Sequence, residues 1–352
     1  MDGIEGRLRD ILAHAPGDVG ALDALGRHLN DAKRHAEAIA CFEHALAIDP
    51  GSAPIAAHRD DAIADAAQWL LVENYRRTTG RAPRLSPPRG FNERILHRIL
   101  FDRDPRLKIV CDKLAVREFI AGRVGADLMV PLLGVWERAA DIPWLGLPKH
   151  FVLKPSHASG AIAMIEQGVR LDTRRVAEAA DGWVAIDYFD QSLEWAYRGL
   201  PRRILAEPLL LDPAGGPALE IYVWTFGGRA KVMRTISGAK AGGSRRGGFF
   251  DAEGRPIAIQ AGIPYGDAPL PRGLRPTLIR LAEQVAADFS SMRVDFYVLG
   301  KDLKIGELTP YTRAGAMQWN PPEHDDLMGR LWEPDFPLSD LPTDPRRARS
   351  PI

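Results

Sequence analysis

The stretch 292–309 restricts the possible folds of this 352-residue chain more than any other part of it. Two strand-like runs flank a Gly-Lys-Asp turn signal, a pattern that predicts a β-hairpin. With the turn centred on Lys301, Asp295 lies directly across from Glu307. The fold must therefore accommodate two carboxylates on neighbouring strands, whose repulsion destabilises a sheet unless positive charge lies between them.

The same register predicts which hairpin residues share the carboxylate face. Arg293 lies across from Thr309 on that face. A cation such as Mg²⁺ would remove the repulsion, because hard cations prefer carboxylate oxygens and leave room for phosphate oxygens. A structural cluster in which Arg293 pairs with both acids explains the hairpin equally well. The apolar residues of the opposite face predict a core, and they are Val294, Phe296, Val298 and Leu308.

Composition and charge exclude several classes of protein. The 46 basic residues balance the 46 acidic ones, so no overall positive field points to nucleic acid or to an anionic membrane. Cys41 and Cys111 lie too far apart to form a metal-binding or redox motif. The sequence shows neither a signal-peptide core nor an apolar run of membrane-spanning length. We expect a cytoplasmic protein with no membrane span and no nucleic-acid partner.

Residues 19–52 match one tetratricopeptide-type (TPR) repeat. The small Gly26 and Ala38 allow two helices to approach closely, with Phe42 packed between them. Residues 4–15 are typical of the second helix of a truncated repeat. So short an array cannot bury its own faces. We therefore expect these helices to pack on the rest of the chain, on a second copy or on a protein partner.

A strand beginning at Phe151 delivers Lys154 to a short Ser/Gly loop. A lysine at a strand end is placed to meet a phosphate, and Ser159, Gly160 and the loop amides can donate to phosphate oxygens. The spacing is not that of a P-loop. A polar turn with an exposed lysine is the simpler alternative for this stretch taken alone.

Two further strands carry carboxylates, Glu207 near the end of one and Glu220 at the start of the next. Either carboxylate could accept a hydrogen bond from an adenine amino group or a ribose hydroxyl. Carboxylates at strand ends are commonly only solvated, so neither residue alone predicts a nucleotide site.

The order of these features resembles that of the ATP-grasp superfamily, from the lysine strand and polar loop to the late Arg-x-Asp and Glu-x-Thr hairpin. Longer motifs resemble the TupA-like ATP-grasp family, which is named for a protein of teichuronopeptide biosynthesis. The resemblance covers about residues 70–332. Its motifs begin at Pro88 (Pro-Arg-Gly-Phe-Asn-Glu), Asp112 (Asp-Lys-Leu-Ala-Val-Arg-Glu), Val130 (Val-Pro-Leu-Leu-Gly-Val-Trp) and Arg203 (Arg-Ile-Leu-Ala-Glu).

The resemblance implies an α+β ATP-grasp fold, in which two subdomains clamp ATP, preceded by a short all-α segment. The mixture of strands and helices without a regular βαβ rhythm also predicts the α+β class. We expect a TPR-like segment at 1–66, the N-terminal part of the ATP-grasp body at 67–150, nucleotide-binding subdomains at 151–332 and a poorly ordered Pro-rich tail at 333–352.

The resemblance further implies ATP and Mg²⁺ as cofactors and assigns residues to them. Lys113 and Lys154 would hold the phosphates, and the loop with Ser159 and Gly160 would close over them. Adenine and ribose would contact Glu207 and Glu220. The metal ligands would be Asp295, Glu307 and Thr309.

Catalytic and substrate residues follow from the same resemblance. Arg293 would neutralise the phosphoryl group in transfer, with Lys154 and His157 as the other candidate catalytic residues. The substrate carboxylate or phosphate would meet Arg245, Arg246 and Arg313.

The implied function is that of an ATP-dependent carboxylate–amine ligase acting through an acyl phosphate. Its substrates would be a small-molecule or glycan carboxylate and an amine, in cell-surface polysaccharide or peptide–sugar polymer biosynthesis. The loop departs from the family pattern, since Ala158 and Ala161 replace two glycines and restrict its backbone. A non-catalytic scaffold and a phosphotransferase acting on a sugar or small metabolite are the alternatives.

Overall fold

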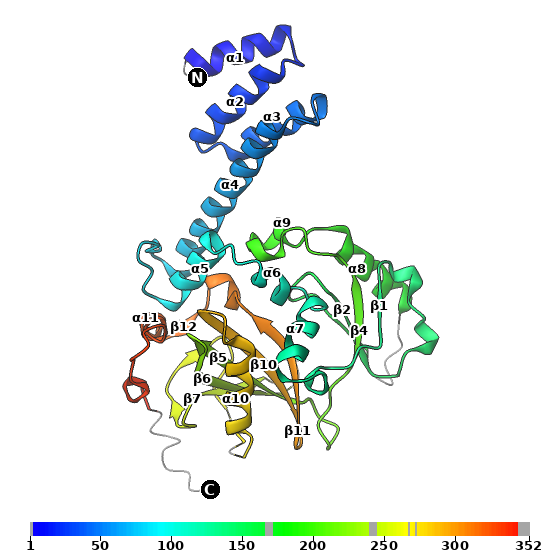
Figure 1. The fold of residues 1–352 in the computed structure, drawn as a ribbon, viewed down its shortest axis with the longest axis vertical. Coiled ribbons are helices and arrows are strands. Elements are labelled where there is room, and N and C mark those ends of the chain that lie inside the picture. Colours follow the sequence, from blue (N-terminus) through cyan, green and yellow to red (C-terminus); the bar gives the residue numbers. More distant parts are fainter. Residues whose placement is uncertain (1–2, 166–171, 239–244, 267, 272, 344–352) are drawn as a thin grey trace. The chain divides into compact units, whose positions relative to one another are not determined.

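In the computed structural model the chain forms two compact units, Met1–Ala82 and Pro83–Ile352. The structure describes residues 3–165, 172–238, 245–266, 268–271 and 273–343, and Figure 1 shows their helices and strands.

The first unit is all helical, as a TPR-type array requires. Asp18 caps the second helix, because its side chain accepts a hydrogen bond from the backbone N–H of Ala21 at 2.9 Å. Residue 66, the expected first domain boundary, falls inside the last helix. The four helices are α1 (Gly3–His14), α2 (Val19–Asp31), α3 (His35–Ile48) and α4 (Ala53–Thr79).

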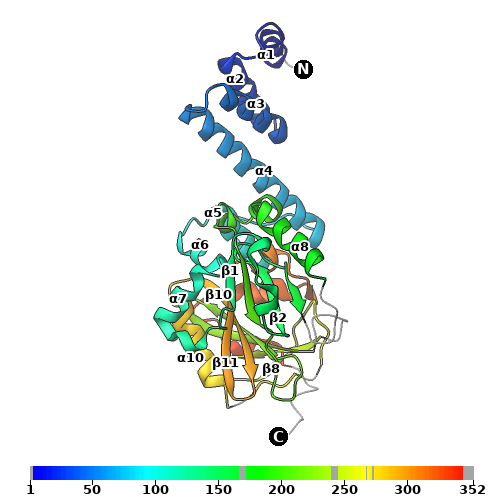
Figure 2. The same ribbon diagram turned by 90° about the vertical axis from the view of Figure 1, so that its right-hand side faces the viewer.

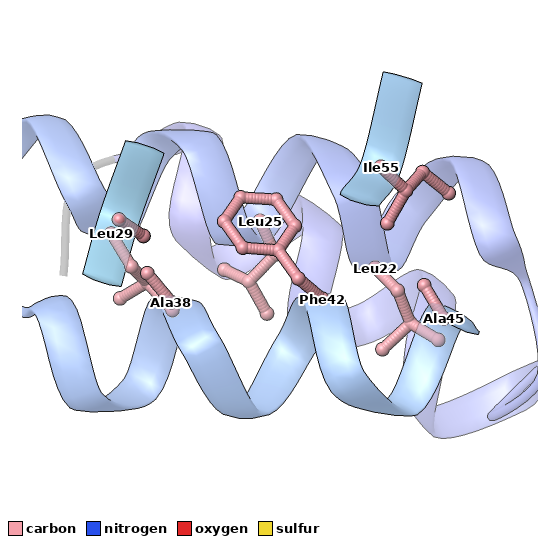
Figure 3. Packing of buried hydrophobic residues seen from close by; sticks show 8 residues of the cluster. Leu22, Leu25, Leu29, Ala38, Phe42, Ala45 and Ile55 are labelled. Carbon is pink, nitrogen blue, oxygen red and sulfur yellow. The ribbon is translucent and has the colours of Figure 1, made fainter. Parts of the chain in front are cut away.

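The core of this unit forms where Gly26 of α2 meets Phe42 of α3. A Cβ atom on Gly26 would lie 2.5 Å from Cε1 of the Phe42 ring, so only glycine permits this approach. Figure 3 shows Phe42 among the buried aliphatic side chains of the cluster. Those side chains include Leu22, Leu25, Leu29, Ala38, Ala45 and Ile55.

The second unit contains a four-stranded sheet with the strand order β1-β4-β2-β3. Its apolar core includes Phe151, Leu153 and Ile204, with Ala180 of α8 packed against them. The strands are β1 (Gly134–Trp136), β2 (Phe151–Pro155), β3 (Ala163–Ile165) and β4 (Ile204–Pro208), and the helices before and beside them are α5 (Phe91–Phe101), α6 (Arg106–Cys111), α7 (Ala115–Val124), α8 (Thr173–Ala185) and α9 (Phe189–Ser192).

A six-stranded antiparallel sheet completes the second unit, with the strand order β11-β10-β5-β6-β7-β8. Helix α10 packs across β5 and β10 and buries Leu278, Leu281 and Val285. Figures 1 and 2 show this helix against the sheet in two views. The elements are β5 (Leu219–Phe226), β6 (Arg229–Ser237), β7 (Arg246–Asp251), β8 (Pro256–Ile257), α10 (Arg275–Ala286), β10 (Ser291–Leu299) and β11 (Asp302–Thr309).

A short two-stranded sheet and one more helix follow, and together with the sheets above they confirm the α+β class. Of the tail expected at 333–352, residues up to Thr343 are described, and Thr343 forms a β-bridge with Ile257. The rest of the tail lies outside the described residues. Within the described part of the chain, none of the helices combines the length and apolar character that a membrane crossing requires. The remaining elements are β9 (Gln260–Ala261), β12 (Trp319–Asn320) and α11 (His324–Arg330).

In the hairpin β10–β11, Asp295 pairs with Glu307 as expected, but the turn and the register that produce this pairing differ from those expected. Its turn is the two-residue Gly300–Lys301, not a turn centred on Lys301, because Leu299 pairs with Asp302. A β-bulge at Gly306 then shifts the register by one residue. This shift brings Asp295 opposite Glu307.

Candidate active site

The site is built on one face of the six-stranded sheet. Strand register places a row of side chains across β11, β10, β5 and β6, and a second row beside it. Side chains in register on adjacent strands point to the same face, so these rows form one polar surface. The first row is Glu307, Asp295, Tyr222 and Arg234, and the second begins with Thr309, Arg293 and Trp224.

Arg293 and Asp295 form a bidentate ion pair at the centre of this surface. Nε and Nη2 of Arg293 donate to the two carboxylate oxygens, both at 2.6 Å. Nη2 also donates to Oγ1 of Thr309 at 3.1 Å, and the guanidinium lies over the ring of Tyr222. Burial raises the pKa of Asp295 to about 6, although Arg293 opposes this shift. Burial alone lowers the pKa of Arg293, but Asp295 outweighs it and leaves the pKa above its usual value.

Glu307 is the free carboxylate of the hairpin. Within the described part of the chain it forms no hydrogen bond or ion pair, so Arg293 makes a direct ion pair with one acid and not with both. Among the residues that the structure describes, no three acidic, histidine or cysteine side chains gather into a metal-binding group. Two carboxylates suit a cation such as Mg²⁺, which binds through one or two carboxylates and takes phosphate oxygens and water for the rest.

A pocket opens between the four-stranded sheet and strands β5 and β10. Its volume is about 830 Å³, counting space open to solvent. Lys154 and Glu207 lie on its wall, with Nζ of Lys154 2.6 Å from Oε2 of Glu207. Nη1 of Arg117 lies 3.5 Å from the other oxygen of this carboxylate. The remaining wall is largely apolar and includes Val152, Ile162, Met164, Leu209 and Tyr297.

Glu220 also lines this pocket, but its carboxylate is already engaged. The hydroxyl of Tyr222 donates to Oε2 at 2.7 Å, and Nη2 of Arg245 donates to Oε1 at 2.7 Å. The structure therefore brings Arg245 to the site. Arg246 is exposed at the start of β7 and donates to the carbonyl of Arg245 at 3.0 Å.

Lys113 contacts the loop that follows β2. Nζ of Lys113 donates to the carbonyl of Ala158, and its backbone N–H donates to the carbonyl of Ser156 at 2.9 Å. Burial lowers the pKa of Lys113. Gly160 adopts a left-handed φ of +82°, so the loop keeps one glycine-type conformation despite its two alanines. Ser159 lies near Tyr188, where burial raises the pKa of the phenol and Ser159 opposes this shift.

His157 points toward the end of α8 and not toward the hairpin. Nε2 lies 3.1 Å from the carbonyl of Trp183 and 3.3 Å from that of Ile186, so this nitrogen carries the proton. Burial lowers the pKa of His157, which favours the neutral ring. In this geometry His157 anchors the loop.

Arg313 lies in the strained turn that follows β11. Arg313 and Ala314 have left-handed φ values of +53° and +51°, which cost free energy in residues other than glycine. Asn92 holds the end of this turn, because its side-chain amide exchanges two hydrogen bonds with the backbone of Met317. The Arg313 side chain is exposed and has no hydrogen bond or ion pair within the described residues.

Sequence comparison decides the family. Residues 93–333 match the family described as TupA-like ATPgrasp. The chain belongs to the TupA-like ATP-grasp family. The expected family and ATP-grasp fold are thereby confirmed. Among curated proteins, none matches this TupA-like sequence.

Solved structures similar to this TupA-like chain include ATP-grasp enzymes at low identity. A D-alanine–D-alanine ligase from Bacillus anthracis complexed with ATP is 16% identical, with 58% of this chain and 55% of that chain covered and a TM-score of 0.35. The ATP-grasp ligase PsnB, complexed with a precursor variant, Mg and ADP, is 10% identical, covers 73% and 61%, and has a TM-score of 0.37. An N5-carboxyaminoimidazole ribonucleotide synthetase from Thermus thermophilus is 14% identical, covers 68% and 51%, and has a TM-score of 0.34. The TupA-like chain spans less than two thirds of the length of each of these proteins.

Sequence reasoning missed three residues of the sheet face in this TupA-like protein. Tyr222 and Trp224 follow Glu220 at alternate positions, which places all three side chains on one face of β5. Arg234 lies in the middle of β6 after the apolar Val232 and Met233, and a buried arginine inside a central strand is the signal that marks it.

Proposed function

We propose that this protein is an ATP- and Mg²⁺-dependent ligase that joins a carboxylate to an amine. The observation that carries the proposal is the hairpin, where Asp295 and Glu307 face each other beside Arg293 and Thr309. Membership of an ATP-grasp family supports ATP, magnesium and ligation as the general chemistry.

The pocket beside the hairpin suits the adenosine part of ATP. Its wall combines apolar side chains with a few polar groups, as small-molecule sites do. The apolar side chains of Val152, Met164 and Leu209 would enclose the adenine ring. Glu207 and Glu220 are the acceptors for an adenine amino group and a ribose hydroxyl, and Glu220 must first release Arg245 or share its oxygens.

Positive charge for the phosphates comes from two sides. Lys154 lies on the pocket wall, and Lys113 lies under the loop that carries Ser159 and Gly160. Asp295 and Glu307, with Thr309, would hold Mg²⁺, which supplies charge neutralisation to the phosphates when bound. Because each oxygen of Asp295 accepts one hydrogen bond from Arg293, the metal would bind at the remaining lone pairs of this carboxylate.

The proposed chemistry has two steps. An oxygen of the substrate carboxylate attacks the γ-phosphorus of ATP, and the bond to the β–γ bridging oxygen breaks, which gives ADP and an acyl phosphate. The amine nitrogen then attacks the acyl carbon, and phosphate and a proton leave as the amide forms. Arg293 would neutralise the phosphoryl group in transfer, and the surrounding walls would exclude water.

The family name points to the substrates. A TupA-like enzyme would form an amide in a cell-surface polysaccharide or a peptide–sugar polymer, using ATP in the cytoplasm. Arg245, Arg246 and the exposed Arg313 are the candidates for contacts with an anionic substrate. The N-terminal helices would bind a protein partner or a second copy.

The test compares purified wild-type protein with the Asp295→Asn variant. Mass spectrometry of pools of carboxylates and amines should show an ATP-dependent amide product with the wild type and none with the variant. Asp302→Asn, on the exposed turn side of the same hairpin, is the matched control and should keep activity. A phosphorylated product would indicate a phosphotransferase, and failure to bind Mg·ATP at millimolar concentration would indicate a scaffold. Full activity of a folded Asp295→Asn variant would refute the metal assignment.

A further inference from the structure

Arg234 is a buried cation without a counter-ion. Its side chain is on the polar face of β6, and the residue is only 5% exposed. Nη2 donates to the carbonyl of Ala261 at 2.6 Å, and Ile263 is a more distant acceptor at 3.5 Å. Nε is buried and has no hydrogen-bond partner, and within the described residues Arg234 forms no ion pair.

Trp224 presents a second unpartnered donor beside it. The residue is 2% exposed, and its indole Nε1–H has no acceptor among the residues that the structure describes. Both side chains pack on Phe249, whose ring is stacked on the indole at 5.9 Å and lies 4.7 Å from Cζ of Arg234. Nε of Arg245 is a third buried N–H, again with no partner in the described part of the chain.

Two other guanidinium groups lie near Arg234, those of Arg293 and Arg245, and each pairs with its own carboxylate. Burial lowers the pKa of Arg234 to about 10, with Tyr222 opposing this shift and Arg293 and Arg245 adding to it, so Arg234 remains a cation at neutral pH. Removing a guanidinium from water without a partner costs several kcal/mol, and each buried unpaired N–H adds to this cost. A neutral water molecule could accept a hydrogen bond, but it cannot neutralise the charge. An anion can both accept the hydrogen bonds and neutralise the charge.

The position of Arg234 identifies which molecule carries the anion. Arg234 of β6 is in the same row as Asp295 of β10, and strand β5 lies between these two strands. Two strand spacings separate their backbones by roughly 10 Å. The guanidinium of Arg234 meets Phe249 of β7 and the carbonyl of Ala261, on the side of β6 away from Asp295, so a phosphoryl group bound at Asp295 is not its partner. A substrate that extends from the hairpin along the row can reach it.

We propose that Arg234 and Trp224 bind an oxyanion, a carboxylate or phosphate, that the substrate carries in addition to the carboxylate it contributes to the amide. The inference rests on the proposed function for the identity of that molecule as substrate. Nε of Arg245 supplies a further buried donor, which has no hydrogen-bond partner among the described residues. The protein thus selects a substrate with two acidic groups, one at the reaction centre and one on β6.

The test uses glutarate and inorganic phosphate as probes, titrated by calorimetry into the full-length protein with and without saturating Mg·AMP-PNP. The nucleotide analogue occupies the phosphate positions near Lys154, so binding that persists reports on β6. Trp224→Phe removes one N–H and keeps the aromatic packing. We expect it to weaken probe binding about 10-fold, as loss of a hydrogen bond to a charged group does. Arg234→Lys keeps the charge but loses the planar donors, and it should weaken binding at least as much.

The controls separate this inference from the proposed function. Trp332→Phe changes an indole that packs on Phe91 and Phe226 and should bind the probes as the wild type does. Neutral glutaramide should not bind. Since Trp224→Phe removes an unsatisfied donor, its melting temperature without probe should equal or exceed that of the wild type.

Each outcome is decisive. Tighter binding of glutarate assigns a carboxylate, and tighter binding of phosphate assigns a phosphate ester. Equal probe affinity in wild type and Trp224→Phe overturns the oxyanion site and leaves the proposed function in place. The same holds if the wild type binds Mg·AMP-PNP but neither probe. A wild type that binds the probes but not the nucleotide contradicts the proposed function and leaves the oxyanion site in place.

Discussion

Gly306 lies against the ring of Tyr297, so closely that a Cβ atom at this position would come within 2.4 Å of Cε2 of the ring. Gly306 is the extra residue of the bulge in β11. The contact that requires glycine therefore lies at the bulge that places Asp295 opposite Glu307.

Gly306→Ala should consequently damage both stability and the site. Because Tyr297 is packed in the sheet, we expect a loss of about 1–3 kcal/mol in the free energy of unfolding. Urea unfolding measures this loss. Gly182→Ala on an exposed position of α8, where nothing lies within 4 Å, should be neutral or stabilising. Equal stability of Gly306→Ala and wild type would show that the bulge relaxes without cost.

Lys154→Gln should weaken nucleotide binding. The substitution removes the cation that lies 2.6 Å from Glu207 on the pocket wall. We expect the dissociation constant for Mg·ADP, measured by calorimetry, to rise about 10-fold or more. Lys149→Gln, an exposed lysine just before β2, is the matched control. An unchanged affinity in Lys154→Gln would remove this lysine from the phosphate site.

Glu194 should make stability depend on pH. Burial, and secondly the charge of Glu307, raise the pKa of Glu194 to about 8 from an ordinary value of 4.5. The native state therefore keeps a proton that the unfolded chain loses, so the free energy of unfolding falls as pH rises from about 4.5 to about 8. Glu194→Gln should reduce this fall by a few kcal/mol, as urea unfolding at stepped pH would measure.

The exposed Glu178 of α8 provides the control for this pH series. Glu178→Gln should retain the pH dependence of the wild type. Parallel stability curves for wild type and Glu194→Gln would mean that Glu194 titrates normally.

Phe42→Ala should destabilise the N-terminal unit. Removing a buried phenylalanine from a core costs about 3–5 kcal/mol. Gly26→Ala should also destabilise this unit, because its Cβ would meet the Phe42 ring at 2.5 Å, whereas Gly6→Ala has open space. Hydrogen exchange of the full-length chain would show the loss in α2 and α3 while Mg·ADP affinity is unchanged. Protection equal to wild type in these helices would argue against the cluster as their core.

Much of the hairpin could be predicted from the sequence. Strict alternation of polar and apolar residues assigns Arg293 and Asp295 to one face and Val294 and Phe296 to the other, because successive side chains of a strand point to opposite sides. The small residues at Gly26 and Ala38 similarly predicted the helix contact at Phe42. Family motifs placed Lys154 and Glu207 together, although not as an ion pair.

Only the tertiary structure decided which strands are neighbours. Local periodicity carries no information about pairing between β5 and β10, which are about 70 residues apart in the sequence, and this pairing brings Tyr222 and Trp224 beside the hairpin. Contacts with distant residues likewise decide three other features. They are the bulge at Gly306, the hydrogen bond of His157 at the end of α8, and the ion pair of Glu220 with Arg245. The sequence by itself determined which side chains each strand offers to a face, and packing between strands remote in the chain determined which of them meet.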